Sequence, residues 1–158
     1  GGTTRAAAVH APRTGELFVA HEGGGATLNG TPISTSRVGR ASDAFAVTSL
    51  AFKAASRADS RFTALNATVT RLRVIGSAAL EICYVACGKF DLLVHEALAP
   101  WDVAAAALIA REAGAVVRSL RTGRDAAWDE PQVAIGNPKI VGDLFAKVPS
   151  LVGTPGRG

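Results

Sequence analysis

Residues 100–114 read Pro100-Trp-Asp-Val-Ala-Ala-Ala-Ala-Leu-Ile-Ala-Arg-Glu-Ala-Gly114, and this stretch decides the fold. It is apolar almost all round until Arg111 and Glu112. An amphipathic surface helix would carry polar residues on one face, whereas a helix that is apolar all round is buried. The stretch therefore predicts a helix over 101–113 that lies between two layers of the protein.

The flanking sequence alternates between short strands and helices. Two apolar runs, 5–10 and 16–21, are separated by Ala11-Pro-Arg-Thr-Gly15, which has the composition of a turn and predicts a hairpin. Asn29-Gly30 predicts a tight type I′ turn between further strands. Strands are also expected at 44–50, 71–75, 91–95, 115–118 and 132–135, helices at 78–90 and 138–148, and partly helical structure over 51–68. This alternation is typical of an α/β domain of layered sheet and helices.

The composition is that of one folded domain. Of the 158 residues 48% are hydrophobic and 19% charged, which excludes a disordered chain. The net charge is +4, but no basic cluster collects it, so we expect no nucleic-acid partner. No apolar run is long enough to span a bilayer and no signal-peptide pattern opens the chain, so we expect no membrane association and a cytoplasmic location. The domain is expected over 1–150, with a flexible tail over 151–158.

A few polar and sulfur-containing residues are expected to be structural. Cys83 and Cys87 lie in an apolar stretch and read as small hydrophobic side chains without metal or disulfide. His10 and His21 fall in the predicted hairpin and are expected to be ordinary strand residues. Glu112 is expected to hold the end of its helix rather than a metal ion.

Several motifs in a fixed order carry a family resemblance. Gly76-Ser-Ala-Ala-Leu80, then Asp91, then the stretch from Pro100 to Gly114 resemble the second signature of the inositol monophosphatase family, a Trp-Asp that opens a helix ending in Glu-Ala-Gly. Upstream, Gly15-Glu-Leu-Phe18 and Gly23-Gly-Gly-Ala-Thr-Leu-Asn-Gly30 resemble that family's hairpin and glycine-rich turn. The resemblance covers roughly residues 9–148. It implies the C-terminal lobe of the inositol monophosphatase and fructose bisphosphatase-like fold, and magnesium-dependent hydrolysis of a small phosphate monoester.

Asp102 matches the family aspartate that binds a magnesium ion. Mg²⁺ is a hard cation that prefers carboxylate and water oxygens, and paired metal ions activate the attacking water and stabilise the leaving oxygen. Without the resemblance, an aspartate here would be read as a helix N-cap. The two interpretations are compatible, because one carboxylate oxygen can cap the helix while the other binds a metal.

Four further residues are candidates for substrate contacts by the same resemblance. Ser77 and Ala78 match a position where a small residue and a backbone N–H lie against the substrate, although Gly76-Ser77 could simply end a strand and cap the next helix. The family places a substrate-binding glutamate seven residues before the metal aspartate, where this chain has His95, with Glu96 one place later. Either the loop shifts by one residue or the histidine takes that contact, and a surface Glu96 without function is an equal alternative.

The family's first signature, Asp-Pro-Ile-Asp-Gly-Thr, is absent from this chain. One carboxylate cannot hold Mg²⁺ tightly, so the chain alone is expected to bind Mg²⁺ weakly and to be catalytically incomplete. Loss of a lobe would expose apolar surface, so we expect a homo-oligomer or a missing N-terminal lobe as partner. The expected substrate is inositol 1-phosphate, with histidinol phosphate or another small phosphate monoester as alternatives. A non-catalytic half-length binding or dimerisation module is the alternative function.

Overall fold

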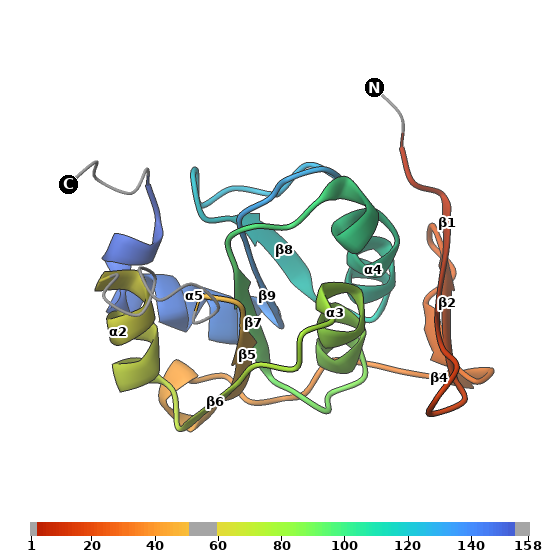
Figure 1. Cartoon of the computed structure of the whole chain (residues 1–158), viewed down its shortest axis with the longest axis horizontal. Coiled ribbons are helices and arrows are strands. Elements are labelled where there is room, and N and C mark those ends of the chain that lie inside the picture. The colour runs from red at the N-terminus through yellow and green to blue at the C-terminus, as the bar shows by residue number, and fades with distance from the viewer. Residues whose placement is uncertain (1–2, 51–59, 154–158) are drawn as a thin grey trace.

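The computed structural model describes residues 3–50 and 60–153, which form two sheets and the helices around them (Figure 1). The first sheet is antiparallel and meanders in the order β1 Ala6–Ala11, β2 Glu16–His21, β3 Ala26–Leu28 and β4 Thr31–Pro32. The predicted hairpin is therefore confirmed. So is the predicted two-residue turn, because Asn29 (φ 50°) and Gly30 (φ 80°) both have the positive φ that a type I′ turn requires.

The second sheet has five strands in the order β6-β5-β7-β9-β8. The strands are β5 Phe45–Thr48, β6 Arg71–Arg73, β7 Leu92–His95, β8 Val116–Ser119 and β9 Val133–Gly136. β5 pairs in parallel with both β6 and β7, whereas β9 runs antiparallel to β7 and β8. The carboxyl ends of β5, β6 and β7 therefore lie at one edge of the sheet, and the candidate site forms there.

Helices cover both faces of the second sheet. α3 Ala78–Ala86 and α4 Pro100–Glu112 lie between the two sheets, whereas α2 Ser60–Thr68 and α5 Pro138–Lys147 lie on the far face (Figure 1). Short 3-10 turns at Ala41–Asp43 and Pro149–Leu151 complete that side. β7 and β9 are buried along their whole length because both of their faces are covered. The predicted α/β layering is confirmed.

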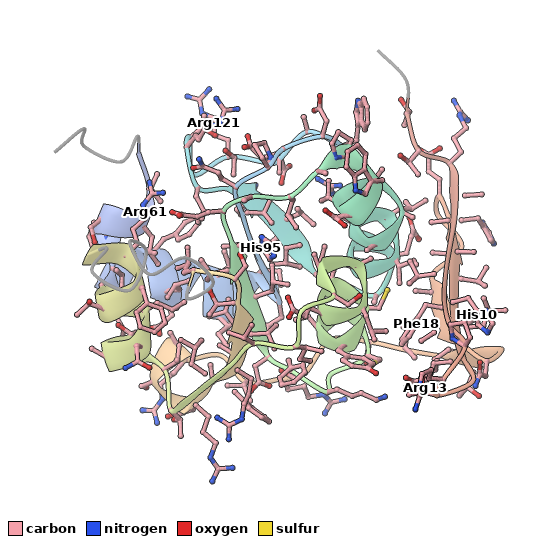
Figure 2. All side chains as sticks on the ribbon, in the orientation of Figure 1. His10, Arg13, Phe18, Arg61, His95 and Arg121 are labelled. Carbon is pink, nitrogen blue, oxygen red and sulfur yellow. The ribbon has the colours of Figure 1, made fainter. Side chains whose placement is uncertain are left out.

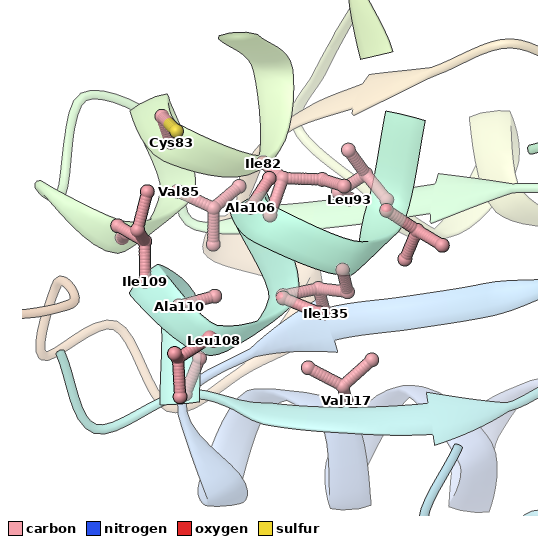
Figure 3. Close-up of a cluster of buried hydrophobic side chains, with 14 of the residues drawn as sticks. Ile82, Cys83, Val85, Leu93, Ala106, Leu108, Ile109, Ala110, Val117 and Ile135 are labelled. Carbon is pink, nitrogen blue, oxygen red and sulfur yellow. The ribbon is translucent and has the colours of Figure 1, made fainter. Parts of the chain in front are cut away.

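The larger core lies around α4, as the apolar stretch predicted. Ile82 and Val85 of α3 face Ala106 and Ile109 of α4, while strand residues such as Ile135 close the cluster from the second sheet (Figure 3). The small alanine side chains of α4 let the neighbouring layers approach closely. The other face of the helix packs on β1 and β2, where Phe18 points towards the helices and His10 points away from them (Figure 2). α4 is thus enclosed between two sheets.

Glu112 joins the first sheet to this core. Its two carboxylate oxygens accept hydrogen bonds from the backbone N–H groups of Gly23 and Gly25, each at 2.9 Å. These bonds hold the pKa of Glu112 below its ordinary value. The residue lies at the end of its helix, as expected, and its partner is the glycine-rich loop at 23–25.

Several element ends differ from the predicted ones for local reasons. The helix predicted over 78–90 ends at Ala86, because the chain reverses at Gly88 with φ +73°. The strand predicted over 71–75 ends at Arg73, because the N–H groups of Ile75 and Gly76 bond to the side chain of Glu81. α2 begins at Ser60, and the rest of the segment predicted to be partly helical, residues 51–59, lies outside the described residues, as do 1–2 and most of the predicted tail.

Two remaining expectations concern the cysteines and the membrane. Cys83 is buried and Cys87 half-buried, both as free thiols, and burial raises the pKa of Cys83 to about 12. Over residues 3–50 and 60–153, no helix combines the length and apolarity that a membrane crossing needs.

Candidate functional site

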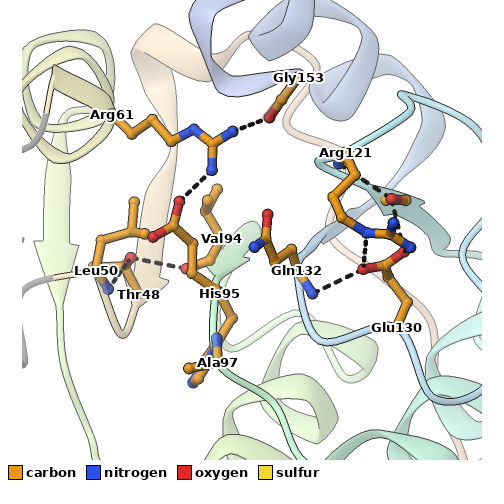
Figure 4. Close-up of polar contacts among 12 residues, drawn as sticks. Thr48, Leu50, Arg61, Val94, His95, Ala97, Arg121, Glu130, Gln132 and Gly153 are labelled. Carbon is orange, nitrogen blue, oxygen red and sulfur yellow. Dashed lines mark hydrogen bonds and ion pairs between the residues drawn. The ribbon is translucent and has the colours of Figure 1, made fainter. Parts of the chain in front are cut away.

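A cleft of about 450 Å³ opens at the carboxyl ends of the parallel strands. Ligand sites in open α/β sheets form at this edge, where successive strands leave in different directions. Thr48 at the end of β5 fixes the local geometry: its hydroxyl donates to the carbonyl of Val94 at 2.8 Å and accepts from the N–H of Leu50 at 3.1 Å (Figure 4). The cleft is lined by Ser49, Leu50, Gly76, Ala78, Glu81, His95, Glu96, Ala97, Asp102 and Gln132.

Asp102 lies at the third residue of α4 and lines this cleft. Its Oδ2 accepts a hydrogen bond from the backbone N–H of Ala99 at 3.1 Å, so the carboxylate satisfies a donor at the start of the helix. Asp102 is not the N-cap itself, because the helix begins at Pro100 and Ala99 takes the cap position. No described residue donates to Oδ1, which leaves that oxygen available to a ligand in the cleft.

His95 ends β7 and is 8% exposed. Burial lowers the pKa of the imidazole to about 4, and the nearby negative charge of Asp102 opposes this shift. The ring is therefore neutral at pH 7. Its Nδ1 accepts from the N–H of Ala97 at 3.4 Å, so the neutral ring carries its proton on Nε2. His95 thus offers the cleft a neutral hydrogen-bonding group.

Glu96 lies beside His95 but is committed elsewhere. Its carboxylate pairs with the guanidinium of Arg61, which is 3% exposed and also donates to the carbonyl of Gly153 (Figure 4). Glu96 is therefore a half-buried ion-pair partner rather than a free surface residue. The pair ties α2 and the C-terminal segment to the rim of the cleft.

The turn Gly76–Ala78 separates the two neighbouring predicted residues. Ala78 lines the cleft, whereas Ser77 lines a different groove beside the end of β1. Ser77 occupies the N-cap position of α3, yet its hydroxyl makes no capping hydrogen bond. The cleft thus brings together four of the predicted residues, Ala78, His95, Glu96 and Asp102, and leaves Ser77 outside.

Glu81 is a site residue that sequence reasoning missed. It is 1% exposed, lines the cleft and accepts hydrogen bonds at Oε1 from Ile75 N–H (2.8 Å) and Gly76 N–H (2.9 Å). Burial raises the pKa of the Glu81 carboxyl, and the two N–H groups oppose this only in part. Its signal in the sequence is a lone carboxylate in the apolar run 78–86.

Gln132 also escaped the sequence reasoning. It lines the cleft just before β9, and its buried Oε1 has no hydrogen-bond partner among the residues described. Its side chain lies between the end of β7 and Glu130 (Figure 4). No motif distinguishes this glutamine in the sequence.

The side chains that could serve as metal ligands decide whether the cleft can hold a metal ion. Two carboxyl groups other than the ion-paired Glu96 line it, Asp102 and Glu81, and among the described residues no lysine or arginine does. Within the described ranges no group of three or more His, Cys, Asp or Glu side chains is placed to hold a metal ion. Mg²⁺ requires several oxygen ligands in near-octahedral geometry. The residues described here therefore do not by themselves fit a complete magnesium site.

Comparison with known protein sequences identifies relatives along almost the whole chain. The family model described as the inositol monophosphatase family matches residues 1–151. A protein of Vibrio cholerae named Nus factor SuhB is 39% identical over 127 residues, which is 78% of this chain and 48% of that protein. An inositol monophosphatase of Dictyostelium discoideum is 36% identical over 143 residues, or 87% of this chain and 52% of that protein. The chain thus spans about half the length of these curated relatives.

Solved structures share the fold. The inositol monophosphatase from Anabaena (Nostoc) sp. PCC 7120 superposes with a TM-score of 0.85 at 28% identity, over 98% of this chain and 61% of that one. The Thermotoga maritima IMPase superposes with a TM-score of 0.83 at 29% identity, over 95% of this chain and 57% of that one. The described layers are therefore a large part, but not the whole, of the fold in those proteins.

Proposed function

The chain belongs to the inositol monophosphatase family, and from this premise we propose that it supplies the Asp102 portion of a Mg²⁺-dependent site that hydrolyses small phosphate monoesters. The observation that carries the proposal is the placement of Asp102. Its carboxylate is held at the start of α4 through Oδ2, and Asp102 lines a cleft of about 450 Å³, large enough for a small phosphorylated molecule.

The charge of the cleft supports a role for a cation. A phosphate monoester is a dianion near neutral pH, while Asp102 and Glu96 line the cleft and His95 is neutral there. The guanidinium of Arg61 is paired with Glu96 at the rim. Without a bound cation the phosphate would meet net repulsion. A divalent ion held in part by Asp102 would reverse this and supply the positive charge.

The same cleft explains why the chain alone should be catalytically incomplete. One free carboxylate oxygen cannot compete with the hydration shell of Mg²⁺. Ligands from the rest of the family fold would have to complete the set. We therefore propose that the isolated chain binds Mg²⁺ weakly and shows no useful turnover, and that the activity belongs to an assembly with the N-terminal lobe.

The proposed substrate is inositol 1-phosphate, with histidinol phosphate or another small phosphate monoester as the alternative. His95 bears on this choice, because its neutral ring offers one N–H donor where a carboxylate would accept from two hydroxyls. A substrate with fewer hydroxyls near this position would lose fewer hydrogen bonds when a histidine replaces a carboxylate. A cytoplasmic location suits the two free thiols of Cys83 and Cys87.

The alternative from another class is a non-catalytic binding or dimerisation module. Several relatives carry the name Nus factor SuhB rather than that of a phosphatase. This alternative predicts that Asp102 contributes nothing beyond its hydrogen bond to the N–H of Ala99. A variant that keeps the bond but removes the charge therefore separates the two functions.

The experiment compares Asp102→Asn with Asp125→Asn, an exposed carboxylate outside the cleft. Each is measured by titration calorimetry with Mg²⁺ and by phosphate release from inositol 1-phosphate, for the chain alone and with an N-terminal lobe of the family. We expect little Mg²⁺ binding by any chain alone, and loss of at least tenfold in affinity and turnover with Asp102→Asn in the assembly. Equal behaviour of the two variants there, or robust turnover by the isolated chain, would refute the proposal.

A further inference from the structure

A second hollow lies beside α5, apart from the candidate cleft. It has a volume of about 650 Å³, against about 450 Å³ for the cleft, and the two share no lining residue among those described. One wall is α5, and the other is the outer strand β8 with the loop that follows it (Figure 1). Small-molecule sites have volumes of about 300–1,000 Å³, so the hollow is large enough for one.

The floor of the hollow is apolar. Val141 of α5 is buried, and Val116 of β8 and Phe145 of α5 pack against the same hydrophobic cluster while they remain partly exposed. All three side chains line the hollow. An apolar molecule that contacted them would remove apolar surface from water, and this removal is the main favourable contribution of such surfaces to binding.

Gly142 keeps the hollow open on the α5 side. It lies in the interior of α5, where glycine is less favourable than alanine because it loses more conformational freedom on folding. Close packing does not explain the glycine, since a Cβ at this position would meet no neighbouring heavy atom within 4 Å. Gly142 therefore preserves open space at the wall of the hollow that it lines.

The rim carries a guanidinium without a partner. Arg118 pairs with Asp125 at 2.6 Å, and this pair occupies the one carboxylate among the described residues that line the hollow. Arg124 is exposed, and its guanidinium makes no hydrogen bond or ion pair with a described residue. The rim thus keeps one uncompensated positive charge next to an apolar floor.

The backbone of the loop that carries Arg124 is fixed. Ser119 N–H donates to the carbonyl of Arg124 at 2.8 Å, and Gly123 N–H donates to the carbonyl of Ser119 at 2.8 Å. Gly123 has a φ of +71°, which glycine adopts without steric cost. Binding at this rim therefore orders one side chain rather than a whole loop, and a site that is already formed loses less conformational entropy.

We propose that this hollow is a second ligand site, which takes a small carboxylate with an apolar body. The apolar part would lie on Val116, Val141 and Phe145, and the carboxylate would bind the guanidinium of Arg124. The planar guanidinium matches the two oxygens of a carboxylate, and such charge-assisted pairs are stronger than neutral hydrogen bonds. Because the hollow shares no described lining residue with the cleft, this proposal is independent of the proposed function.

Other classes of ligand match the hollow less well. A cation would meet two guanidiniums and a carboxylate that is already paired, so it would be repelled. A phosphate dianion would find one free guanidinium but no free helix N–H groups, because the Asn137 side chain already accepts from the N–H groups of Lys139 and Ile140 at the start of α5. A neutral apolar molecule would leave Arg124 without a partner. A small apolar carboxylate satisfies both the floor and the rim.

The test is a titration of the full chain with phenylbutyrate, followed through the backbone amide signals of Gly123 and Gly142 in heteronuclear NMR spectra. Phenylbutyramide has nearly the same shape without the charge, phenylbutylamine carries the opposite charge, and phenyl phosphate tests a dianion. Arg124→Gln removes the free guanidinium, and Gly142→Leu fills the hollow from α5. Arg13→Gln, which removes an exposed arginine outside the hollow, is the matched control.

We expect saturable shifts of both amides with phenylbutyrate, and binding that is about fivefold weaker for the neutral and cationic analogues and for Arg124→Gln. Arg13→Gln should bind as the wild type does, and Gly142→Leu should abolish the shift at Gly123. Arg124 is exposed, so Arg124→Gln decides the question even where Gly142→Leu disturbs folding.

The proposal is overturned if no saturable binding of phenylbutyrate occurs up to about 5 mM, or if the neutral amide binds equally well. Equal effects of Arg124→Gln and Arg13→Gln would also overturn it, because they would show attraction by the overall charge of the chain. Tighter binding of phenyl phosphate than of phenylbutyrate would refute the assignment of a carboxylate.

Discussion

Replacing Glu81 tests whether a single buried carboxyl group holds the turn at the mouth of the cleft. Glu81 Oε1 accepts from Ile75 N–H and Gly76 N–H, which lie beyond the end of β6 at Arg73. Glu81→Ala removes both hydrogen bonds, whereas Glu81→Gln keeps an acceptor of the same shape and removes only the charge. The two variants therefore separate hydrogen bonding from electrostatics.

The expected magnitude follows from exposure. A buried donor left without a partner costs about 1–3 kcal/mol, but Ile75 is 44% exposed, so water can reach the released N–H groups. The loss is then the net value of two hydrogen bonds, about 2 kcal/mol for Glu81→Ala. Burial raises the pKa of Glu81, so this group stabilises the fold fully below its ordinary value of 4.5 and loses that contribution as pH rises through the folded-state pKa. Glu81→Gln has no such loss and should be at least as stable as the wild type at pH 7.

The assay is denaturant unfolding at pH 4.5 and pH 7, followed by tryptophan fluorescence, together with amide exchange at Ile75 and Gly76. Glu22→Ala, which removes an exposed partner of Arg5, is the control and should change stability by less than about 0.5 kcal/mol. The reasoning fails if Glu81→Gln loses as much stability as Glu81→Ala at pH 7. It also fails if Glu81→Ala leaves the exchange of both amides unchanged.

Three further substitutions and one chemical modification test other parts of the fold. Glu112→Ala should lower the free energy of unfolding by about 1–2 kcal/mol, because it releases the glycine-rich loop. The two N–H groups lower the pKa of Glu112, so this difference in stability from the wild type should shrink below pH 4.5 in the same unfolding assay. Gly136→Ala should destabilise the fold by about 1–3 kcal/mol, because a Cβ there would lie 2.8 Å from a side-chain carbon of α5. Gly142→Ala lies in open space on that helix and should stabilise the fold by about 0.5–1 kcal/mol. Thermal unfolding of the two variants should therefore show midpoints on opposite sides of the wild-type value. Iodoacetamide should modify half-buried Cys87 before buried Cys83. Mass spectrometry of digests taken at successive times measures the order, and faster modification of Cys83 would contradict its burial in the core.

The layers of the fold could be predicted because the sequence patterns that indicate their helices and turns are local or strongly periodic. The apolar run of α4 requires burial on all sides, and Asn29-Gly30 requires one turn geometry, so both could be predicted without knowing any partner. The end of β6 could not, because it depends on Glu81, which reaches back to N–H groups five and six residues earlier. Local patterns give an element's type, while its ends are set by such side-chain contacts.

The candidate site was predictable only where a motif marked it. Asp102, Ala78, His95 and Glu96 were found through the family resemblance, and the topology brings these four to one cleft. Ser77 and Ala78 are adjacent in sequence but line different hollows, because consecutive residues of an extended turn point in opposite directions. Glu81 and Gln132 enter the cleft through tertiary packing, and Arg61 reaches Glu96 across 35 positions. Contacts of this range have no local signature.

The turn at residues 76–78 is a wall shared by two hollows. Ala78 lines the cleft that contains Asp102, and Ser77 lines the groove beside β1. The hydrogen bonds from Ile75 N–H and Gly76 N–H to Glu81 Oε1 hold this turn in place. Loss of these bonds would therefore move Ala78 relative to Asp102, so a buried carboxyl group that binds no ligand itself still sets the shape of the cleft.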